Sequence, residues 1–306
     1  MLLVRDELRH AVSPGENTLA LGVFDGVHRG HVMLVERARA EAQARGLGAG
    51  VVTFHPSPVT VLRPEIPFSY LITLEQRVEL LKATGVDWVA VLQFTSELAQ
   101  VSAEDFVRIL VEEAGLRVLV VGENFAVGRG REGTAPRLRE LGAGLGFEVV
   151  PVPLGESSDE AISSTRIRRV LSEGDMPGVA GLLGRPYSLR GPVLHGDERG
   201  RTIGFPTINL GVSADQALPP HGVYVTHAEV RGAMYAGTTN IGTRPTFDGV
   251  DRRVETYLLD FSGDVYGEIV RIEFLGRLRE ERRFDGVEAL VAQIEQDVAT
   301  TRAYFA

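Results

Sequence analysis

The chain has no cysteine, which excludes disulfide bonds and thiolate metal sites and gives no sign of an oxidising compartment. Lysine is scarce, and the basic residues are mostly arginines scattered among acids, with a formal net charge of −9. A general nucleic-acid-binding protein would show a basic patch, so we predict no nucleic-acid partner. A few local arginines can still hold a nucleotide phosphate on an acidic protein.

Long apolar segments are missing as well. The N-terminus, "MLLVRDELRH", becomes charged at Arg5 and lacks the apolar core of a signal peptide. No apolar run approaches the roughly 20 residues that a membrane-spanning helix needs. These absences favour a cytoplasmic protein that does not act at a membrane. No pattern in the sequence identifies a protein partner.

The first half of the 306-residue chain alternates short apolar runs with amphipathic stretches. The apolar runs predict buried strands at 18–24, 49–54, 86–94, 117–122 and 147–153. The amphipathic stretches predict helices at 31–46, 73–85 and 102–115, and Thr73 with Gln76 has the spacing of a capping box. Continuously apolar strands that alternate with helices predict a doubly wound parallel sheet. Ligands bind such sheets at the carboxyl ends of the strands, at the topological switch point.

The second half changes character from about Pro186, where glycine and proline separate short β-like runs. In one of them, Val270, Ile272 and Phe274 alternate with charged residues, as in a half-buried strand. Short strands joined by glycine-rich turns predict a small antiparallel β-barrel. We therefore predict two domains, an α/β domain at 1–184 and a barrel domain at 185–306.

One helix is predicted at the end of the chain, at 284–305. Asp285 and Glu288 have capping spacing at its start. One apolar stripe runs along it and consists of Val287, Leu290, Val291, Ile294 and Val298.

The stretch "FDGVHRGH", at 24–31, places His28 and His31 three residues apart directly after the first predicted strand. At a helix start the two imidazoles lie side by side, near free backbone N–H groups and the positive end of the helix dipole. There they can donate hydrogen bonds to a phosphate whose charge grows in a transition state. Two alternatives stay open: a metal site, for which the sequence places no third ligand, and a simple helix cap beside an exposed histidine.

The H-x-G-H pattern resembles the nucleotidyltransferase superfamily, which includes class I aminoacyl-tRNA synthetases and small adenylyl- and cytidylyltransferases. A second segment should hold the triphosphate, and "ISSTRIRRVL" at 162–171 suits that role. Its Ser163, Ser164 and Thr165 can cap a helix, while Arg166 and Arg168 offer charge to phosphates. An ordinary helix cap with solvated arginines is the alternative.

Further motifs make the resemblance specific. With "TFHPSP" (53–58) and "VGENFAVGRGREGT" (121–134), the first half is similar to the adenylyltransferase module of bacterial bifunctional riboflavin kinase/FAD synthetases. The second half carries that family's kinase signatures in order: "GPVLHGDERGRTIGFPTINL" (191–210), "NIGTRPTF" (240–247), "VETYLLDFSGDVYG" and "LREERRF" (278–284). The chain departs from the family's usual pattern at Ser57, Asn124, Ala126-Val127 and Tyr257.

The resemblance implies that the protein phosphorylates riboflavin to FMN and adenylylates FMN to FAD, with ATP and Mg²⁺. It implies that His28 and His31 act in adenylyl transfer and that Glu255 is the base of the kinase reaction. The implied ATP contacts are Gly22, Phe24, Asp25, Gly30, Ser164, Thr165 and Arg168 in one site, and Gly196, Gly200 and Arg201 in the other. Thr207 and Asn209 would hold Mg²⁺, and Asn124 and Arg279 would contact the flavin.

The residue types of the kinase motifs suit this chemistry. Thr207 and Asn209 are two apart, so on a strand they present two oxygens on one side, although a T-x-N pair alone is more often a turn. Glu255 shares a regular strand face with Tyr257, Leu259 and Phe261, and a carboxylate on an apolar face is costly unless it is used or paired with an arginine. No G-x-x-x-x-G-K-[ST] loop is present, so the glycines of "GPVLHGDERGR" would close over ATP.

Two other functions fit parts of the pattern. One is a cytidylyl- or pantetheine-type transferase with a barrel appended, which would have no flavin affinity. The other is a non-catalytic flavin-binding protein, which would tolerate the loss of Glu255 and His31.

Overall fold

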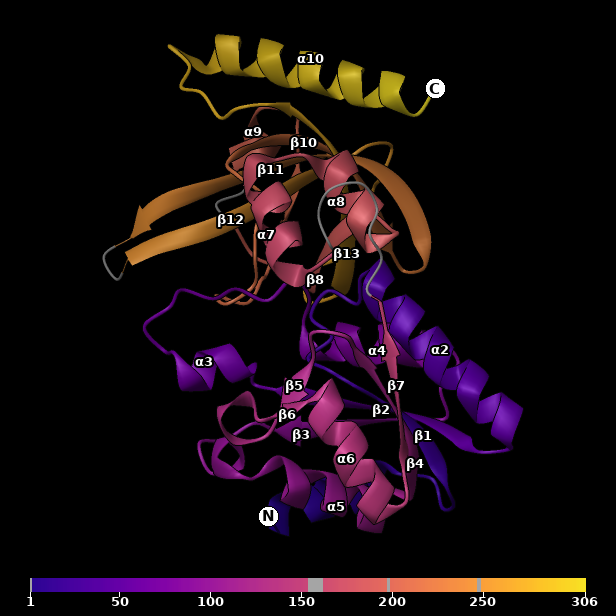
Figure 1. Ribbon diagram of the computed structural model, residues 1–306. Coiled ribbons are helices and arrows are strands. Elements are labelled where there is room, and N and C mark those ends of the chain that lie inside the picture. The colour runs from indigo at the N-terminus through magenta and orange to yellow at the C-terminus, as the bar shows by residue number, and fades with distance from the viewer. Residues whose placement is uncertain (1, 154–161, 197–198, 247–248) are drawn as a thin grey trace. The chain divides into compact units, whose positions relative to one another are not determined.

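The computed structural model describes residues 2–153, 162–196, 199–246 and 249–306 (Figure 1). The chain divides into two compact units between Ser164 and Thr165. The boundary predicted at 185 from the change in composition lies just before the first barrel strand. The two helices between Ser164 and that strand belong to the second unit, which therefore begins about twenty residues earlier.

The described part of the first unit contains a five-stranded parallel sheet in the order β3-β2-β1-β4-β7. Its strands are β1 (Asn17–Leu21), β2 (Gly48–His55), β3 (Trp88–Gln93), β4 (Leu116–Gly122) and β7 (Glu148–Val152). All five coincide with predicted strands. The chain runs outward from β1 to β3 and then returns to place β4 on the other side of β1, so the topological switch point lies between β1 and β4.

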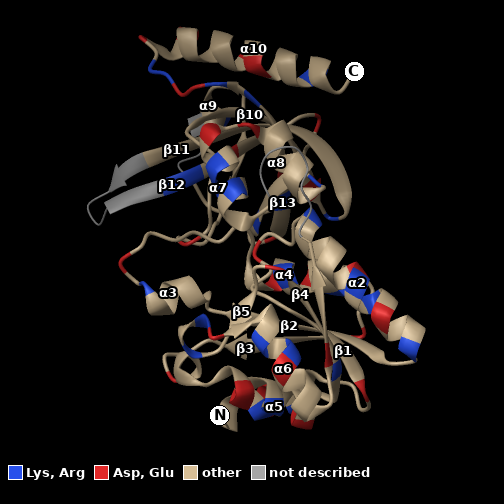
Figure 2. Cartoon of the chain, in the orientation of Figure 1, with Lys and Arg blue, Asp and Glu red and all other residues tan. Residues whose placement is uncertain are grey.

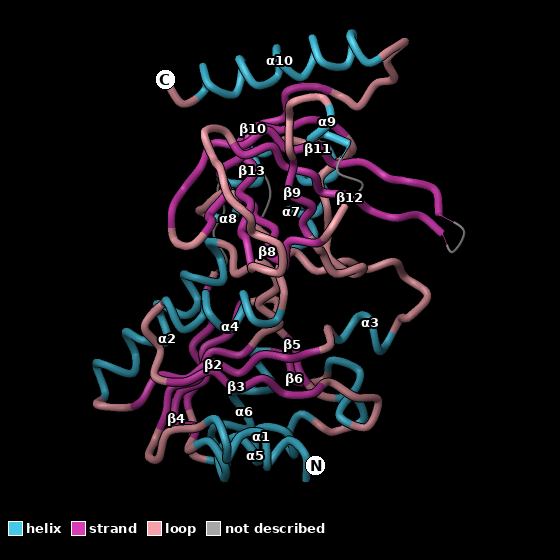
Figure 3. Tube along the Cα trace, turned by 180° about the vertical axis from the view of Figure 1, so that it is seen from behind, coloured by secondary structure: helices cyan, strands magenta, loops and turns pink. Residues whose placement is uncertain are grey.

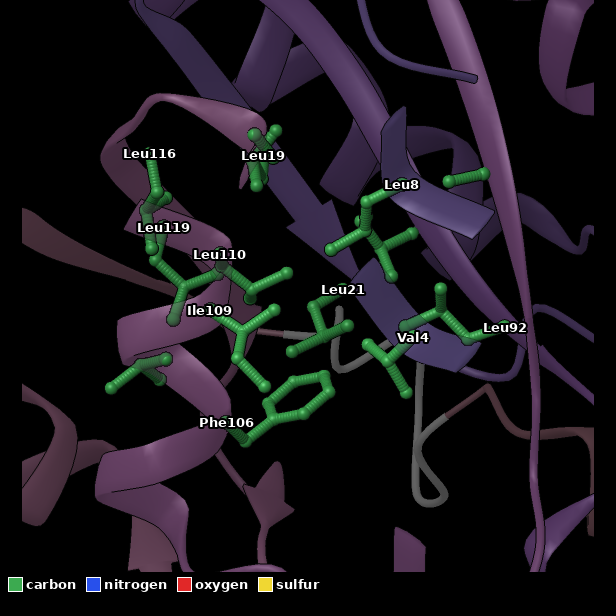
Figure 4. Packing of buried hydrophobic residues seen from close by; sticks show 14 of the residues in the cluster. Val4, Leu8, Leu19, Leu21, Leu92, Phe106, Ile109, Leu110, Leu116 and Leu119 are labelled. Atoms are coloured by element: carbon green, nitrogen blue, oxygen red, sulfur yellow. The ribbon is translucent and has the colours of Figure 1, made fainter. Parts of the chain in front are cut away.

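Helices cover both faces of this sheet. They are α1 (Leu2–Ala11), α2 (Arg29–Arg45), α4 (Leu74–Ala83), α5 (Ala103–Ala114) and α6 (Ala135–Leu145), while the short α3 (Pro58–Leu62) buries none of its residues. Successive strand side chains point to opposite faces, so Leu19 and Leu21 pack with α1, α5 and α6, as Figure 4 shows for Leu8 and Phe106. Ala20 faces the other way and packs with residues of α2 and α4. The predicted doubly wound α/β architecture is confirmed.

Local signals set several helix ends as predicted. Thr73 and Gln76 form the capping box of α4. Gly115 ends α5 in the left-handed conformation, with φ 57°. Helices α1 and α6 were not predicted. In α1 only Val4 and Leu8 are buried, so its apolar signal is short.

Small elements complete the first unit. A two-stranded hairpin and two short 3₁₀ turns connect its larger elements: β5 (Ala126–Val127), β6 (Gly133–Thr134), Leu98–Gln100 and Arg129–Arg131.

The described residues of the second unit form a closed six-stranded barrel in the order β10-β11-β12-β9-β8-β13, antiparallel throughout (Figure 3). Its strands are β8 (Tyr187–Leu194), β9 (Thr207–Leu210), β10 (Gly222–Val230), β11 (Ala233–Thr246), β12 (Gly249–Leu258) and β13 (Ile269–Arg279). Val270, Ile272 and Phe274 are fully buried in its interior, as their alternation predicts. The predicted small antiparallel barrel is confirmed.

In the described ranges, four helices belong to or lead into this unit: α7 (Ser164–Glu173), α8 (Met176–Leu183), α9 (Arg199–Thr202) and α10 (Val287–Tyr304). Helix α8 packs against β8 and β13 and buries Met176, Val179 and Leu183. The sequence reading did not predict α8 or α9.

The C-terminal helix exists, but its predicted cap is wrong. The residue before its first turn is Gly286, which provides no side-chain cap, so Asp285 lies one position too early. The predicted apolar stripe is only half-buried, and Val287 is 61% exposed. The most buried residues of α10 are polar: Asp297 accepts hydrogen bonds from Arg279, and Thr301 shares one with Thr238. Polar pairing to the barrel therefore holds much of this helix.

Charged residues of both signs are interspersed along the helices (Figure 2). On α2, for example, Arg37 and Arg45 both pair with Glu41. None of the helices in the described ranges combines the length and the apolarity needed to cross a bilayer. The cytoplasmic location and the lack of a nucleic-acid partner stay predictions.

Candidate active sites

A strained turn follows β1 at the switch point. Phe24 and Val27 have φ values of 53° and 38°, in the left-handed region that non-glycine residues avoid. Buried contacts hold the turn in place: Phe24 is fully buried, and the Asp25 carboxylate accepts a hydrogen bond from the backbone N–H of Leu71 at 3.1 Å. Such unfavourable backbone conformations persist only where surrounding contacts hold the chain in them, and they are common at ligand-binding sites.

The two histidines lie together at the start of α2. His28 is the N-cap residue, and its Nδ1 accepts a hydrogen bond from the backbone N–H of His31 at 3.3 Å. A neutral His28 therefore carries its proton on Nε2, as a donor. The two rings stack with their centroids 3.5 Å apart, and Phe24 meets His31 edge-on. His28 thus caps the helix, as the alternative expected, but His31 is not exposed and lies side by side with it.

Segment 162–164 approaches this turn. The Ser164 hydroxyl donates to the backbone carbonyl of Asp25 at 2.8 Å. A Cβ added to Gly30 would lie 3.3 Å from the His28 ring and 3.8 Å from the carbonyl oxygen of Ile162, so glycine suits this close approach. The structure therefore brings His28, His31, Gly30 and Ser164 together.

The other residues predicted for this site have varied surroundings. A Cβ on Gly22 would lie 3.2 Å from the Phe24 ring, so both help to build the turn. Asp25 uses its carboxylate inside the protein, on Leu71. Thr165 and Arg168 continue α7 in the second unit.

Asn124 follows β4, the neighbour of β1. Its side chain is exposed at the same sheet edge as the turn, and its backbone carbonyl accepts a hydrogen bond from Arg131 at 3.3 Å. This placement is open to a ligand at the switch point.

This edge of the first unit is suited to an anion. It combines the N-terminus of a 17-residue helix with two imidazoles and a hydroxyl. Helix N-termini bind phosphates because their N–H groups are unsatisfied and the helix dipole is positive there.

The second candidate site is a row of side chains across four barrel strands. Leu194 pairs with Asn209, Asn209 with Glu255, and Glu255 with Asn240. Side chains directly opposite one another in antiparallel strands lie on the same face, about 4.5–5.5 Å apart at Cβ. The polar row Asn209–Glu255–Asn240 therefore crosses β9, β12 and β11. Sequence reasoning did not single out Asn240, although it begins the quoted "NIGTRPTF" motif.

The predicted surroundings of Glu255 are wrong. The buried face of β12 carries Val254, Thr256 and Leu258, and Glu255 lies on the other, outer face. The strand ends at Leu258, so Leu259 and Phe261 do not continue its pattern.

The Glu255 carboxylate is paired and accessible. Its side chain is 29% exposed and accepts a hydrogen bond from Arg253 at 3.1 Å. Glu255 is therefore paired with an arginine, as one alternative expected. Because it lies on the outer face of the strand, the cost of a carboxylate on an apolar face does not arise. Tyr257, its neighbour on the outer face, meets Phe205 edge-on.

Gly196 and Gly200 of the glycine-rich motif lie against Asn209 and Thr207. A Cβ on Gly196 would come within 2.3 Å of the Asn209 amide nitrogen. A Cβ on Gly200 would lie 2.2 Å from the carbonyl oxygen of Phe205 and 3.5 Å from the Thr207 hydroxyl. Glycine is thus required at 200, where the neighbour is a backbone carbonyl, whereas an added methyl group at 196 would have to displace the Asn209 side chain. Arg201 is exposed on α9 in the same loop.

The donors here are a hydroxyl, an amide and a carboxylate. The described residues contain no cluster of three or more His, Cys, Asp or Glu side chains that could hold a metal by themselves. Such a site suits a hard cation that shares its coordination with phosphate oxygens and water, as Mg²⁺ does.

Arg279 ends β13 and is held by α10. Its Nε and Nη2 donate to the Asp297 carboxylate at 3.0 and 2.7 Å, and its guanidinium lies 5.8 Å from the centre of the Phe284 ring. A flavin contact by Arg279 would have to form beside this ion pair.

Family models match both parts of the chain. An FAD synthetase model matches residues 11–166, and a riboflavin kinase model matches residues 183–305. A bifunctional riboflavin kinase/FMN adenylyltransferase of Listeria monocytogenes is 39% identical and covers 98% of this chain and 97% of its own. The protein with the same description from Escherichia coli K12 is 35% identical over 100% and 98% of the two chains.

A solved structure is similar over nearly the whole chain. It comes from Streptococcus pneumoniae, is described as a macrolide-efflux protein, and has 35% identity and a TM-score of 0.88 over 95% of each chain.

Proposed function

The chain belongs to the family of bifunctional riboflavin kinase/FMN adenylyltransferases, and we propose that its two reactions use separate sites, one in each compact unit. It phosphorylates riboflavin to FMN and adenylylates FMN to FAD, with ATP as the donor in both reactions. The proposal is carried by one observation: the histidine pair and Glu255 lie in different units. Relatives with both activities over nearly the full length weigh against the two other functions that fit parts of the pattern.

The kinase reaction takes place at the row Asn209–Glu255–Asn240. Glu255 accepts the proton of the primary hydroxyl of riboflavin as its oxygen bonds to the γ-phosphorus of ATP. The bond between the γ-phosphorus and the bridging oxygen breaks, and ADP leaves. Positioning supplies most of the catalysis in such transfers, and the backbone at Gly196 and Gly200 lies next to the phosphates.

Thr207 and Asn209 hold the cation that accompanies ATP, which we propose to be Mg²⁺. Their oxygens and the close approach of Gly196 support this assignment. When bound, the ion neutralises charge on the phosphates.

Adenylyl transfer takes place at the start of α2. A phosphate oxygen of FMN bonds to the α-phosphorus of ATP, the bond from that phosphorus to the bridging oxygen breaks, and pyrophosphate leaves. The FMN phosphate is already ionised, so no base is needed. His28, His31 and the N–H groups of α2 stabilise the charge that develops.

Glu255→Gln tests the kinase site. It removes the base but keeps the size and polarity of the side chain, and loss of a positioned base costs on the order of 10²–10⁴ in rate. We expect riboflavin phosphorylation to fall by that factor while supplied FMN is still converted to FAD. Glu273→Gln is the matched control, because Glu273 is also a strand carboxylate paired with the arginine two residues before it.

His31→Ala tests the other site in the opposite direction. Loss of one donor to developing charge costs roughly 10²–10³ in rate, so FMN should accumulate from riboflavin without becoming FAD. Products are separated by chromatography, and circular dichroism verifies folding. Loss of both activities in either folded variant would replace the two-site proposal with a single shared site.

A further inference from the structure

A cation lies beside the proposed base of the kinase reaction. The Nη1 of Arg253 donates a hydrogen bond to Oε1 of Glu255 at 3.1 Å, and the two side chains are 23% and 29% exposed. Both lie on the outer face of β12, because the intervening Val254 is buried in the barrel. The guanidinium therefore lies at the point where the proposed reaction moves a proton.

The neighbouring strands leave room beside this arginine. Its register partner on β11 is Gly242, which has no side chain. On the other side, β9 pairs with β12 from Glu255 to Tyr257, so no side chain of β9 lies opposite Arg253. The guanidinium can therefore move along the outer face toward a ligand without displacing a side chain of either strand.

A second carboxylate lies close to this place. A Cβ on Gly242 would lie 2.8 Å from Oε1 of Glu281 and 3.4 Å from the amide nitrogen of Asn240. The Glu281 carboxylate thus takes the position across from Arg253 that a side chain at 242 would have. Two carboxylates beside bound ATP would repel its phosphates. The charge of Arg253 reduces that repulsion, since opposite charges at such short range attract.

The strand that carries Arg253 and Glu255 is held from behind. In the barrel interior the hydroxyls of Thr256 and Thr239 share a hydrogen bond at 2.8 Å, and those of Thr239 and Thr226 share another at 2.8 Å. All three threonines are fully buried, and their hydrogen bonds tie β12, β11 and β10 together. The flexible arginine side chain can therefore move while the backbone under the site keeps its position.

We propose that Arg253 is a further catalytic residue of the kinase reaction, whose guanidinium contacts the phosphoryl group as it passes from ATP to riboflavin. This inference rests on the proposed kinase site at Asn209 and Glu255. A guanidinium suits the role because its planar fork donates two parallel hydrogen bonds to phosphoryl oxygens. Catalysis of phosphoryl transfer consists mainly of positioning and of stabilising the charge on those oxygens.

The movement of charge in the reaction explains how one arginine serves both partners. The electron pair of the hydroxyl O–H bond forms the new O–P bond, and the proton goes to Glu255. The electrons of the broken P–O bond leave with ADP. Glu255 thereby becomes neutral, while FMN carries its phosphate charge beside it. The attraction that holds Arg253 to Glu255 is lost as the phosphoryl group arrives, so the guanidinium moves to the phosphate.

Arg253→Ala in the full chain is the test, and Arg271→Ala is the matched control. Arg271 also lies on a barrel strand and donates to the glutamate two residues after it, Glu273. We expect the kcat of riboflavin phosphorylation to fall by roughly 10²–10³ in Arg253→Ala, with the KM for riboflavin unchanged. Arg253→Lys should lie in between, because an ammonium keeps the charge but not the fork. Arg271→Ala should keep full activity, and all variants should convert FMN to FAD as before.

Inhibition by the product separates contact with the phosphoryl group from a role in holding Glu255. FMN differs from riboflavin by the phosphate, so FMN should inhibit riboflavin phosphorylation at least about tenfold more weakly in Arg253→Ala. The kinase rate is measured as ADP formation, because adenylyl transfer releases pyrophosphate instead.

Two results would overturn the proposal in variants that remain folded by circular dichroism. An unchanged kcat in Arg253→Ala would show that the arginine takes no part. A lower kcat with unchanged inhibition by FMN would show that Arg253 acts through Glu255 and does not touch the phosphate. A failure of the unmodified protein to form FMN would instead overturn the proposed function itself.

Discussion

Gly196→Ala should damage the kinase reaction by displacing Asn209. The added methyl group would lie 2.3 Å from the Asn209 amide nitrogen, whereas ordinary contacts begin at 3.4 Å. Either the loop lifts or the amide rotates away, since both cannot keep their positions. In each case the oxygen proposed to hold the cation leaves its place opposite Glu255.

The size of the effect follows from the shift. The contact is about 1 Å too short, and a misplacement of about 1 Å in an active site typically lowers the rate on the order of 10²-fold. We expect riboflavin phosphorylation to fall by about that factor, with a higher requirement for the divalent cation.

Steady-state assays of both reactions across a series of Mg²⁺ concentrations measure the rate of riboflavin phosphorylation and its cation requirement. Gly276→Ala is the matched control, because a Cβ there meets no atom within 4 Å and the backbone does not have a positive φ. It should keep full activity. The conversion of FMN to FAD should be unchanged in both variants.

An unimpaired kinase in Gly196→Ala would refute the reasoning, because the loop could then not lie against Asn209 during the reaction. Equal loss in Gly276→Ala would do the same, since the effect would then come from any added methyl group in the barrel.

Three further predictions concern the autonomy of the barrel and the stability of the two units. Fragment 185–306 is predicted to phosphorylate riboflavin without making FAD. Fragment 165–306 should have a free energy of unfolding at least about 3 kcal/mol higher than fragment 185–306 in guanidinium denaturation, because it keeps the apolar residues of α8 that pack on the barrel. Equal stability of the two fragments would contradict this role of α8. Asp297→Asn should lower the free energy of unfolding by about 3 kcal/mol, because it leaves the Arg279 guanidinium without its buried carboxylate. Thermal denaturation measures this loss, and an unchanged melting temperature would argue against that ion pair. Arg9 and Arg5 lower the pKa of Glu113 below its ordinary value of 4.5. Their ion pairs with Glu113 therefore stabilise the docking of α1 above pH 4.5, and this stabilisation is lost as the pH falls through the lowered pKa. As the pH is lowered, hydrogen exchange should speed up in the α1 amides before the rest of the first unit, and an equal increase across the whole unit would contradict this.

Much of the architecture is predictable from local patterns. Continuous apolar runs between amphipathic helices predicted all five strands of the parallel sheet, because a strand buried on both faces must be apolar throughout. The alternation at Val270, Ile272 and Phe274 predicted a barrel strand with one buried face. The spacing of His28 and His31 after an apolar run predicted that the two rings would meet at a helix start.

Other features left only weak signals. Helix α1 buries two residues, and α10 depends on polar contacts through Asp297 and Thr301, so apolar periodicity described neither well. Glu255 was assigned to the apolar face of its strand because the residues after it are apolar. The strand ends at Leu258, however, and its buried face is the one that carries Thr256.

The sequence by itself determined the two folds, the switch-point motif and the order of the kinase motifs, because each depends on neighbours along the chain. Only the tertiary structure decided that Leu194, Asn209, Glu255 and Asn240 form one row. These residues are far apart in sequence, and their alignment depends on the register of three strand pairs. A shift of one residue in any pair would turn a side chain to the opposite face, and that choice is made by the packing of the whole barrel interior.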